Sequence, residues 1–314
     1  FVFRRVPAEG NGSAARQWQQ ISTMSGADMH LFFQELLNGL VVGSIYALVA
    51  LGLALIYGTM GVPNFAHGHL YMLGAYVAFA GVTIAHIGYW PSMLAAILVL
   101  ALVGVLLERL VFRPLRNAPE VNTIIAAVGV LFFLQQFAQL VFGGDYRVFP
   151  TPYDKVVHLG GLIATQQQLI VIAAAAVLML LLFWFLKRTL TGATIEAVAQ
   201  NRAGAALVGI DTDRVSMMVF AISAGLAAAA ATLIASINLI SPSMGFSVIL
   251  KAFAIIVLGG MGSVPGAILG AFILAFAESF GGTYISTSYQ DAIAFAVLVV
   301  ILTVRPTGLF AKGT

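Results

Sequence analysis

One amide and two imidazole side chains lie close together in an apolar stretch of the sequence, namely Asn64, His67 and His69. Polar groups inside apolar segments are usually retained for function, and two neighbouring histidines first suggest a metal site. On a helix, however, residues two apart project about 200° from one another, so His67 and His69 cannot readily bind one ion. Because no carboxylate lies nearby in the sequence, we expect no metal ion here.

The same segment has two other interpretations, and both stay open. In the structural one, Asn64 caps a half-helix that follows Pro63, and His67 hydrogen-bonds to carbonyl groups that an interrupted helix leaves free. In the functional one, this segment contacts a passing solute. The residues of that candidate pathway are Asn64, Phe65, His67, Gly68 and, from the other end of the chain, Glu278.

Glu278 is the one carboxylate well inside the carboxy-terminal hydrophobic region. It is either an interfacial residue beside Gly281 and Gly282, or a polar group of the pathway, or a partner for a buried donor. The parts of an enzyme are missing, since the sequence has no cysteine, no HExxH motif and no GxxxxGK[ST] phosphate-binding loop, and no Ser, His and Asp on a plausible common face. We therefore expect no catalysis and no cofactor in this chain.

The elements that position these residues follow from the composition. Of the 314 residues, 61% are hydrophobic and 9% are charged, whereas soluble domains carry about 25% charged residues. At about 20 residues per span, this predicts an all-α polytopic membrane protein with little left over for a soluble domain. The net charge is +3, but the cations stand in short clusters between apolar runs; they indicate topology rather than a nucleic-acid surface.

Apolar runs predict about eight hydrophobic helices, two of them broken or re-entrant. The seven continuous candidates are residues 36–57, 65–84, 92–107, 123–142, 168–186, 215–238 and 290–303. The eighth region, 248–280, is interrupted by glycines and a proline at 259–266, which cannot sustain a regular helix. Its halves, about 11 and 14 residues long, are each too short to cross a membrane alone.

Charge predicts the orientation of these helices. The loop at 109–116, the loop at 187–214 and the carboxy terminus carry the cationic bias, so we place them in the cytoplasm and residues 143–167 outside. Residues 1–28 are polar and begin without Met; we expect them to be a non-native or disordered leader ahead of a single transmembrane domain, 29–314. If Met29 is the true start, an external amino terminus with eight crossings fits; otherwise a re-entrant segment after the first helix fits better.

A weak internal repeat relates the two interruptions. An offset of 202 residues superimposes four glycine, valine and proline residues of the first interruption on identical residues of the second. Repeat-built transporters mark their central pathway with broken helices in corresponding places, although chance recurrence in a chain with 32 glycines is the alternative. The candidate hinges are Gly58, Pro63, Gly259, Gly260, Gly262 and Pro265.

The loop at 187–214 contains apolar residues at roughly helical spacing between Gly192 and Gly209. We predict one short amphipathic helix over residues 193–208, ended by Gly209. An exposed helix with small residues and a basic rim suits docking into a groove of another protein. A helix that lies on the lipid surface is the alternative.

Five motifs together resemble one family of membrane proteins. They are NGLxxGSIYAL at 38–48, NFAHGxxYMxG at 64–74, GIDTDR at 209–214, VLGGMGSVPGA at 257–267 and RPTG at 305–308. In these motifs the chain resembles the inner-membrane permease subunits of bacterial branched-chain amino acid ABC importers, of the H-type rather than the longer M-type. The match runs from about Phe33 to Gly308, and residues 1–28 have no counterpart in it.

The resemblance implies a bacterial inner-membrane complex with a sister permease, two cytoplasmic ATPases and a periplasmic substrate-binding protein. It identifies the helix in the 187–214 loop as a coupling helix that docks into an ATPase cleft. The residues that it assigns to this contact are Glu196, Ala197, Asn201 and Gly209.

Two functions remain in competition. The first is the transmembrane subunit of an ATP-driven importer of leucine, isoleucine, valine or a related small solute. The second is a self-sufficient secondary transporter of amino acids, driven by protons or sodium, in which Glu278 and the histidines act as carriers.

Overall fold

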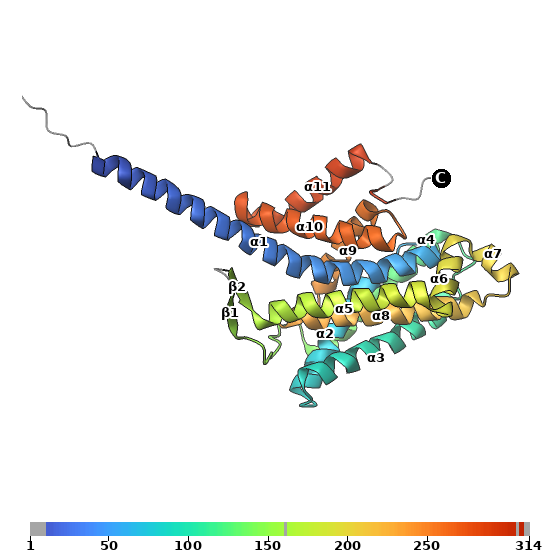
Figure 1. Ribbon diagram of the computed structural model, residues 1–314. Coiled ribbons are helices and arrows are strands. Elements are labelled where there is room, and N and C mark those ends of the chain that lie inside the picture. The colour runs from blue at the N-terminus through green and yellow to red at the C-terminus, as the bar shows by residue number, and fades with distance from the viewer. Residues whose placement is uncertain (1–10, 160–161, 306–307, 311–314) are drawn as a thin grey trace, which may run out of the picture.

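The computed structural model describes residues 11–159, 162–305 and 308–310, with side chains described from Met29 onward (Figure 1). Within these ranges seven helices are long and apolar enough to cross a membrane. The chain is therefore an all-α polytopic membrane protein, as predicted. The main helices are α1 (Asn11–Met60), α2 (His67–Thr83), α3 (Tyr89–Leu107, continued by a π-helical turn Glu108–Phe112), α4 (Glu120–Phe142), α5 (Gln166–Arg188), α8 (Thr212–Ala235), α9 (Met244–Gly259), α10 (Val264–Tyr284) and α11 (Gln290–Val304). The seven are all of these except α2 and α9, which have 17 and 16 residues, and α11 counts together with the short helix Thr287–Tyr289 before it.

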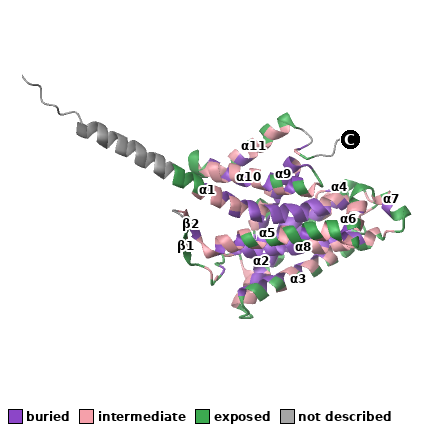
Figure 2. Ribbon diagram, viewed as in Figure 1, coloured by how far each residue is buried: buried purple, intermediate pink, exposed green. Residues whose placement is uncertain are grey.

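The centre of the bundle is formed by α1 and α8. In their apolar stretches 83% and 78% of the residues are buried, against 22% in each of α3, α4 and α5, whose outer faces are left for lipid (Figure 2). Small residues permit close packing at this centre. A Cβ atom at Gly74 of α2 would lie 2.6 Å from the Cα of Ala228 in α8, and one at Gly104 of α3 would lie 2.6 Å from the carbonyl oxygen of Phe220.

The second half of α1 runs from one end of the bundle to the other, while its first half projects beyond the bundle (Figure 1). Where α1 enters the bundle, the side chain of Gln34 exchanges two hydrogen bonds, of 2.9 and 3.1 Å, with the backbone of Ile163 in strand β2 (Leu162–Thr165). Near its end, the carbonyl of Thr59 accepts a hydrogen bond from Arg202. The segments that charge predicts to be outside and inside are thus separated by the length of the bundle, and we call these its outer and inner ends.

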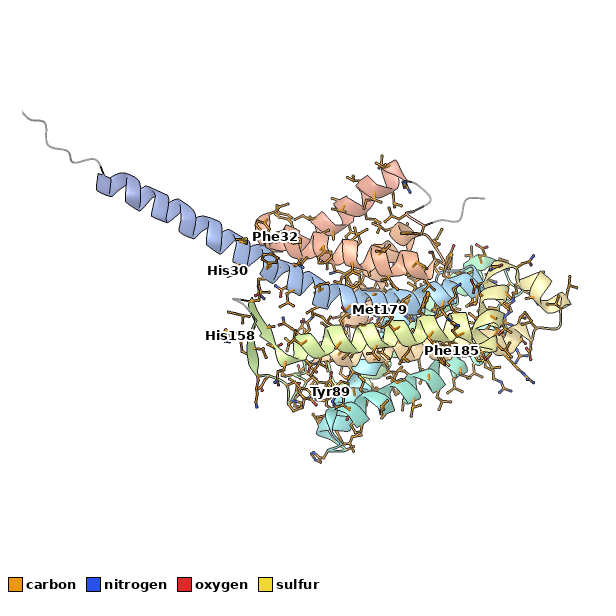
Figure 3. The ribbon with its side chains drawn as sticks, viewed as in Figure 1. His30, Phe32, Tyr89, His158, Met179 and Phe185 are labelled. Atoms are coloured by element: carbon orange, nitrogen blue, oxygen red, sulfur yellow. The ribbon has the colours of Figure 1, made fainter. Side chains whose placement is uncertain are left out.

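A small β-hairpin covers the outer end. Strand β1 (Val156–Leu159) pairs antiparallel with β2. Nearby, Tyr89 at the start of α3 accepts a hydrogen bond from the amide of Gln167 in α5, at 2.9 Å (Figure 3). These strands lie within the 143–167 segment that the sequence predicted only as an external loop.

The second interrupted region is a helical hairpin, which corrects the prediction of two halves too short to cross the membrane. α9 has 16 residues and α10 has 21, and α10 is long enough to cross alone. The helix α10 continues past Phe280, through Gly281 and Gly282, to Tyr284. A Cβ atom at Gly281 would lie 2.6 Å from Ile293 of α11, so the glycine permits close packing rather than ending the helix.

The inner loop contains two helices, α6 (Leu190–Gln200) and α7 (Arg202–Leu207), where the sequence predicted one. Asn201 between them is extended, and its side-chain oxygen accepts a hydrogen bond from the N–H of Gly204 at 2.8 Å. This N-cap starts a new helix. At the other end of the chain, residues 11–28 continue α1 as helix, while residues 1–10 lie outside the described residues and the domain division at 28/29 stays a prediction.

Candidate functional site

The turn between α1 and α2 holds the first group of predicted site residues. Asn64 accepts a hydrogen bond from the N–H of Ala66 at 3.1 Å, and the N–H of His67 donates to the carbonyl of Asn64. The side chain of Asn64 therefore closes the turn just ahead of α2 rather than capping the first residues of the helix itself. It is buried, with 2% of the residue exposed.

His67 satisfies a backbone carbonyl, but on a neighbouring helix. Its Nε2 lies 3.1 Å from the carbonyl oxygen of Val49 in α1, and the residue is fully buried. His69 is also fully buried and makes no side-chain hydrogen bond to any described residue. Among the described residues, no group of three or more His, Asp or Glu side chains could hold a metal ion.

Phe65 and Gly68 pack α2 against α9. The ring of Phe65 lies 4.7 Å from that of Phe253. A Cβ atom at Gly68 would lie 2.6 Å from the Cβ of Ile249, and a Cβ atom at Gly245 would lie 2.6 Å from the carbonyl oxygen of Gly68. Glycine at both positions lets the two helices touch. Contact of this segment with a solute stays a prediction.

The turn between α9 and α10 holds the second group, and its backbone explains the glycines. Gly260 and Gly262 have φ angles of +99° and +79°, in the region that favours glycine. Ser263 then caps α10 by accepting a hydrogen bond from the N–H of Gly266 at 3.2 Å, and Pro265 lies in the first turn of the helix, as is common for proline. Gly259 packs directly against the backbone of Gly266.

The two interruptions meet at the inner end. A Cβ atom at Gly58, two residues before the end of α1, would lie 3.8 Å from the Cα of Gly262 and 3.7 Å from the Cβ of Ala199 in α6. The inner loop thus contacts the end of α1 at the point where α1 meets the second interruption. The internal repeat itself stays a prediction.

Charged residues of α7 and α8 connect the inner loop to neighbouring elements. Arg202 at the start of α7 donates to the carbonyl of Thr59 at 3.4 Å. Asp213 at the start of α8 pairs with Arg113, at 2.6 Å, and with Arg116. Arg116 also pairs with the buried Glu108. Sequence analysis treated these arginines only as topology signals, and their pairing depends on tertiary structure.

The predicted coupling residues are spread over α6, α7 and the turn that follows. Glu196 pairs with Lys187 at 2.9 Å, with both side chains about half exposed. The carbonyl of Ala197 accepts the N–H of Asn201 at 3.0 Å, and Gly209 has a φ of +86°. Two apolar residues between these positions face away from the protein, Leu207 with 89% and Val208 with 76% of the residue exposed.

Sequence analysis missed a buried ion-paired network around Glu278. Lys251 of α9 lies 2.5 Å from a carboxylate oxygen of Glu278 and 2.9 Å from the carboxylate of Asp291 in α11. Tyr46 of α1 donates to Glu278 at 2.7 Å and accepts from Lys251 at 2.9 Å. The available signal was Lys251 itself, a lone cation in an apolar run, because such residues usually have a partner in the bundle.

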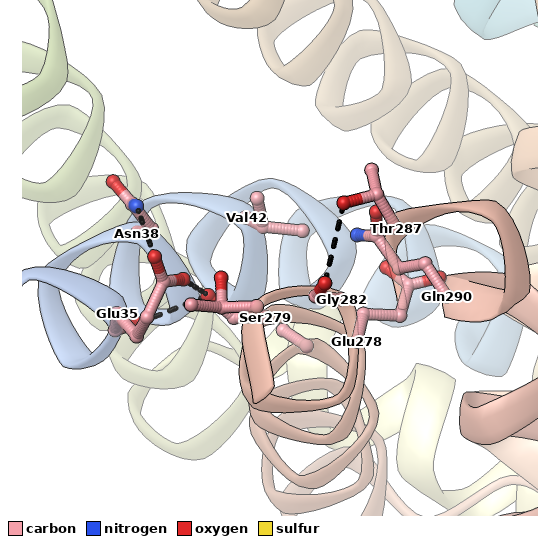
Figure 4. Close-up of a pocket in the computed structure, with 10 residues that line it drawn as sticks. Glu35, Asn38, Val42, Glu278, Ser279, Gly282, Thr287 and Gln290 are labelled. Atoms are coloured by element: carbon pink, nitrogen blue, oxygen red, sulfur yellow. Dashed lines mark hydrogen bonds between the residues drawn. The ribbon is translucent and has the colours of Figure 1, made fainter. Parts of the chain in front are cut away.

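Glu278 also lines a pocket of about 250 Å³ between α1, α10 and the start of α11 (Figure 4). Its lining is mostly polar and consists of Glu35, Asn38, Val42, Ala275, Glu278, Ser279, Gly282, Thr283, Thr287 and Gln290. Because Glu35 follows the Gln34 that binds the hairpin, the pocket lies at the outer end. Of the five predicted pathway residues, only Glu278 lines it.

Known proteins resemble this chain over most of its length. Residues 35–302 match the family described as the branched-chain amino acid transport system permease component. The high-affinity branched-chain amino acid transport system permease protein LivH of Salmonella typhimurium is 35% identical, over 90% of this chain and 96% of the relative. LivH of Escherichia coli K12 is 36% identical, over 90% of this chain and 96% of the relative. The high-affinity branched-chain amino acid transport system permease protein BraD of Pseudomonas aeruginosa is 36% identical, over 91% of this chain and 97% of the relative.

Among solved structures, PsaBC from Streptococcus pneumoniae in complex with Fab is 12% identical and gives a TM-score of 0.49, over 87% of this chain and 92% of that chain. This likeness is too weak to bear on the fold.

Proposed function

Because the chain belongs to the family of branched-chain amino acid transport system permease components, we propose that it forms the membrane-crossing subunit of an ATP-driven importer in the bacterial inner membrane. The solute is leucine, isoleucine, valine or a related small molecule. The chain itself is a transport component without catalysis, and its rearrangement is driven by separate ATPase subunits.

The contact of α6 with the end of α1, which in turn contacts the second interruption, is the observation that supports this proposal. Ala199 of α6 lies against Gly58, and Gly58 lies against Gly262. A displacement of α6 by a bound ATPase would reach the end of α1 directly and the turn between α9 and α10 through Gly58. Turns of glycine and proline are suited to absorb such a movement, so Gly58, Pro63, Gly259, Gly260, Gly262 and Pro265 are proposed as the hinges.

The tip of the inner loop, formed by Leu207, Val208 and Gly209, has the exposed apolar surface expected of a docking site for another protein. Leu207 and Val208 are exposed and apolar at the inner end and precede the exposed Gly209, and the same loop carries the half-exposed Glu196. Apolar residues exposed together near charged ones are typical of interaction sites. We propose that this tip, with Glu196, Ala197, Asn201 and Gly209, enters a groove of an ATPase subunit.

The remaining partners are proposed from the family. A sister permease would pair with this chain in the membrane, and a periplasmic binding protein would deliver the solute at the outer end. The ion-coupled alternative has less support, because the charge of Glu278 is matched by Lys251 and the histidines are buried in helix packing.

Reconstitution into lipid vesicles tests the proposal. The chain together with its partner subunits and ATP is expected to accumulate labelled leucine, and the chain alone is expected to accumulate none under a sodium or proton gradient. Replacing both exposed residues, Leu207→Asp with Val208→Asp, should abolish co-purification of the ATPases. Val148→Asp, at a residue that is 73% exposed at the outer end, is the matched control. Accumulation by the chain alone would overturn the proposal.

A further inference from the structure

Glu35 is a buried carboxylate without a cationic partner. It lies in α1 with 9% of the residue exposed. The two other buried carboxylates of the described residues both have such a partner, Arg116 for Glu108 and Lys251 for Glu278. In the part of the chain that carries described side chains, no Lys, Arg or His nitrogen lies within 4.0 Å of the Glu35 carboxylate. A buried charge normally requires a counter-charge, so this one is available to a cation from outside the chain.

The groups around Glu35 present acceptors rather than donors to the pocket. Ser279 donates its hydroxyl proton to a Glu35 oxygen at 2.6 Å, and Thr287 donates its proton to the carbonyl of Gly282 at 3.2 Å (Figure 4). Both hydroxyls are thus left with free lone pairs. The amide nitrogen of Asn38 points to Glu35 at 3.4 Å, which turns the donor end of this side chain toward the carboxylate.

Charge favours the same kind of ligand. The pocket lining includes two carboxylates, Glu35 and Glu278, and no Lys, Arg or His. Lys251 lies behind Glu278 and is already shared between that residue and Asp291. An anionic group would meet net negative charge, whereas a cation with several N–H groups would find both charge and lone pairs.

We propose that this outer pocket binds a primary ammonium group, with Glu35 as its counter-ion and the hydroxyl of Ser279 as a further acceptor. An ammonium group has three N–H donors, and the carboxylate of Glu35 and the hydroxyl of Ser279, which lie 2.6 Å apart, can accept from the same group. The proposal rests on the proposed function in one respect: the ammonium group would be that of the amino acid delivered at the outer end. The carboxylate of that amino acid would point out of the pocket, away from Glu35 and Glu278.

Equilibrium binding to the complete transporter in lipid nanodiscs tests this assignment. The probes are 3-methylbutylamine, which is leucine without its carboxylate, and 4-methylpentanoate, which is leucine without its ammonium group. Labelled 3-methylbutylamine is expected to bind and 4-methylpentanoate not to compete. Glu35→Gln should weaken amine binding about tenfold or more, as expected for loss of a charged hydrogen bond. Glu120→Gln, the same change at an exposed residue at the inner start of α4, should have no effect.

Further variants and probes distinguish a bound amine from a bound sodium ion, and loss of binding from loss of folding. Glu35→Asp, which keeps the charge, should bind the amine better than Glu35→Gln, and Ser279→Ala gives a second variant if Glu35→Gln does not fold. Glutamine keeps the size of the Glu35 side chain and removes its negative charge. Unchanged amine binding in Glu35→Gln would therefore overturn the proposal, because it would show that the charge is not used. Binding of labelled sodium but no amine would also overturn it. Amine binding without ATP-driven leucine uptake would support the pocket while contradicting the proposed function.

Discussion

Gly58 near the end of α1 and Gly262 in the turn before α10 lie directly against each other. A Cβ atom at Gly262 would be 3.5 Å from the Cα of Gly58. One residue belongs to each interruption, and Ala199 of α6 lies beside Gly58. The inner loop is thus connected to the places where the helix backbone is irregular.

The size of the side chain at Gly58 should control transport. A single methyl group there would make ordinary contacts, 3.7 Å from Ala199 and 3.8 Å from Gly262. We expect Gly58→Ala to keep ATP-driven leucine uptake close to wild type. Gly58→Leu would overfill the contact, which typically costs about 1–3 kcal/mol, and should lower uptake about tenfold. Equal uptake by the two variants would contradict a tight contact at this point.

The sequence predicted the long helices well but not the details at their ends. Apolar periodicity and length identify α1, α3, α4, α5 and α8, since lipid demands such runs. The second half of the α9–α10 hairpin was predicted too short because the apolar run was ended at Phe280, whereas α10 continues through Gly281 and Gly282 to Tyr284. Only the position of Ile293 in α11 shows that Gly281 serves packing.

Two other differences also depend on contacts that no sequence pattern specifies. Asn201 divides the inner helix because its side chain caps a new one through Gly204. Glu278 of α10 forms an ion pair with Lys251, which lies on α9. In both cases the residue types were visible in the sequence, whereas the choice of partner was set by tertiary packing.

Arg202 should transmit movement rather than hold the fold together. Its guanidinium donates to the carbonyl of Thr59 at 3.4 Å, which connects α7 to the end of α1. We expect Arg202→Gln to keep ATP hydrolysis by the assembled complex while lowering leucine uptake several-fold. The ratio of solute moved to ATP hydrolysed is the measurement.

A matched control for Arg202 is Arg214→Gln. The side chain of Arg214 is 78% exposed and pairs with Asp211 three residues earlier, so it links no two elements. Its coupling ratio should equal that of the wild type. If both variants lowered the ratio alike, a general loss of positive charge at the inner end would explain the result instead of the contact with Thr59.

A charge swap should reveal whether Glu196 acts within the chain or on a partner. Its ion pair with Lys187 is 2.9 Å long and about half exposed, and such pairs contribute only about 0–1 kcal/mol. We expect Glu196→Lys to weaken co-purification of the ATPases. Adding Lys187→Glu, which restores the pair in reverse, should not recover it. Full recovery in the double variant would instead assign Glu196 to the intramolecular pair.

Removing Lys251 should destabilise the protein more than removing the whole ion pair. Lys251→Met would leave Glu278 buried without its cation, which typically costs about 3–5 kcal/mol. The double variant Lys251→Met with Glu278→Leu leaves no buried charge at this point and should regain much of the lost stability, since apolar replacements of buried pairs are often neutral. Tyr46→Phe removes one hydrogen bond to Glu278 and should cost only about 1–3 kcal/mol. Thermal unfolding of the purified variants in detergent measures the order, and a double variant less stable than Lys251→Met would contradict a coupled pair.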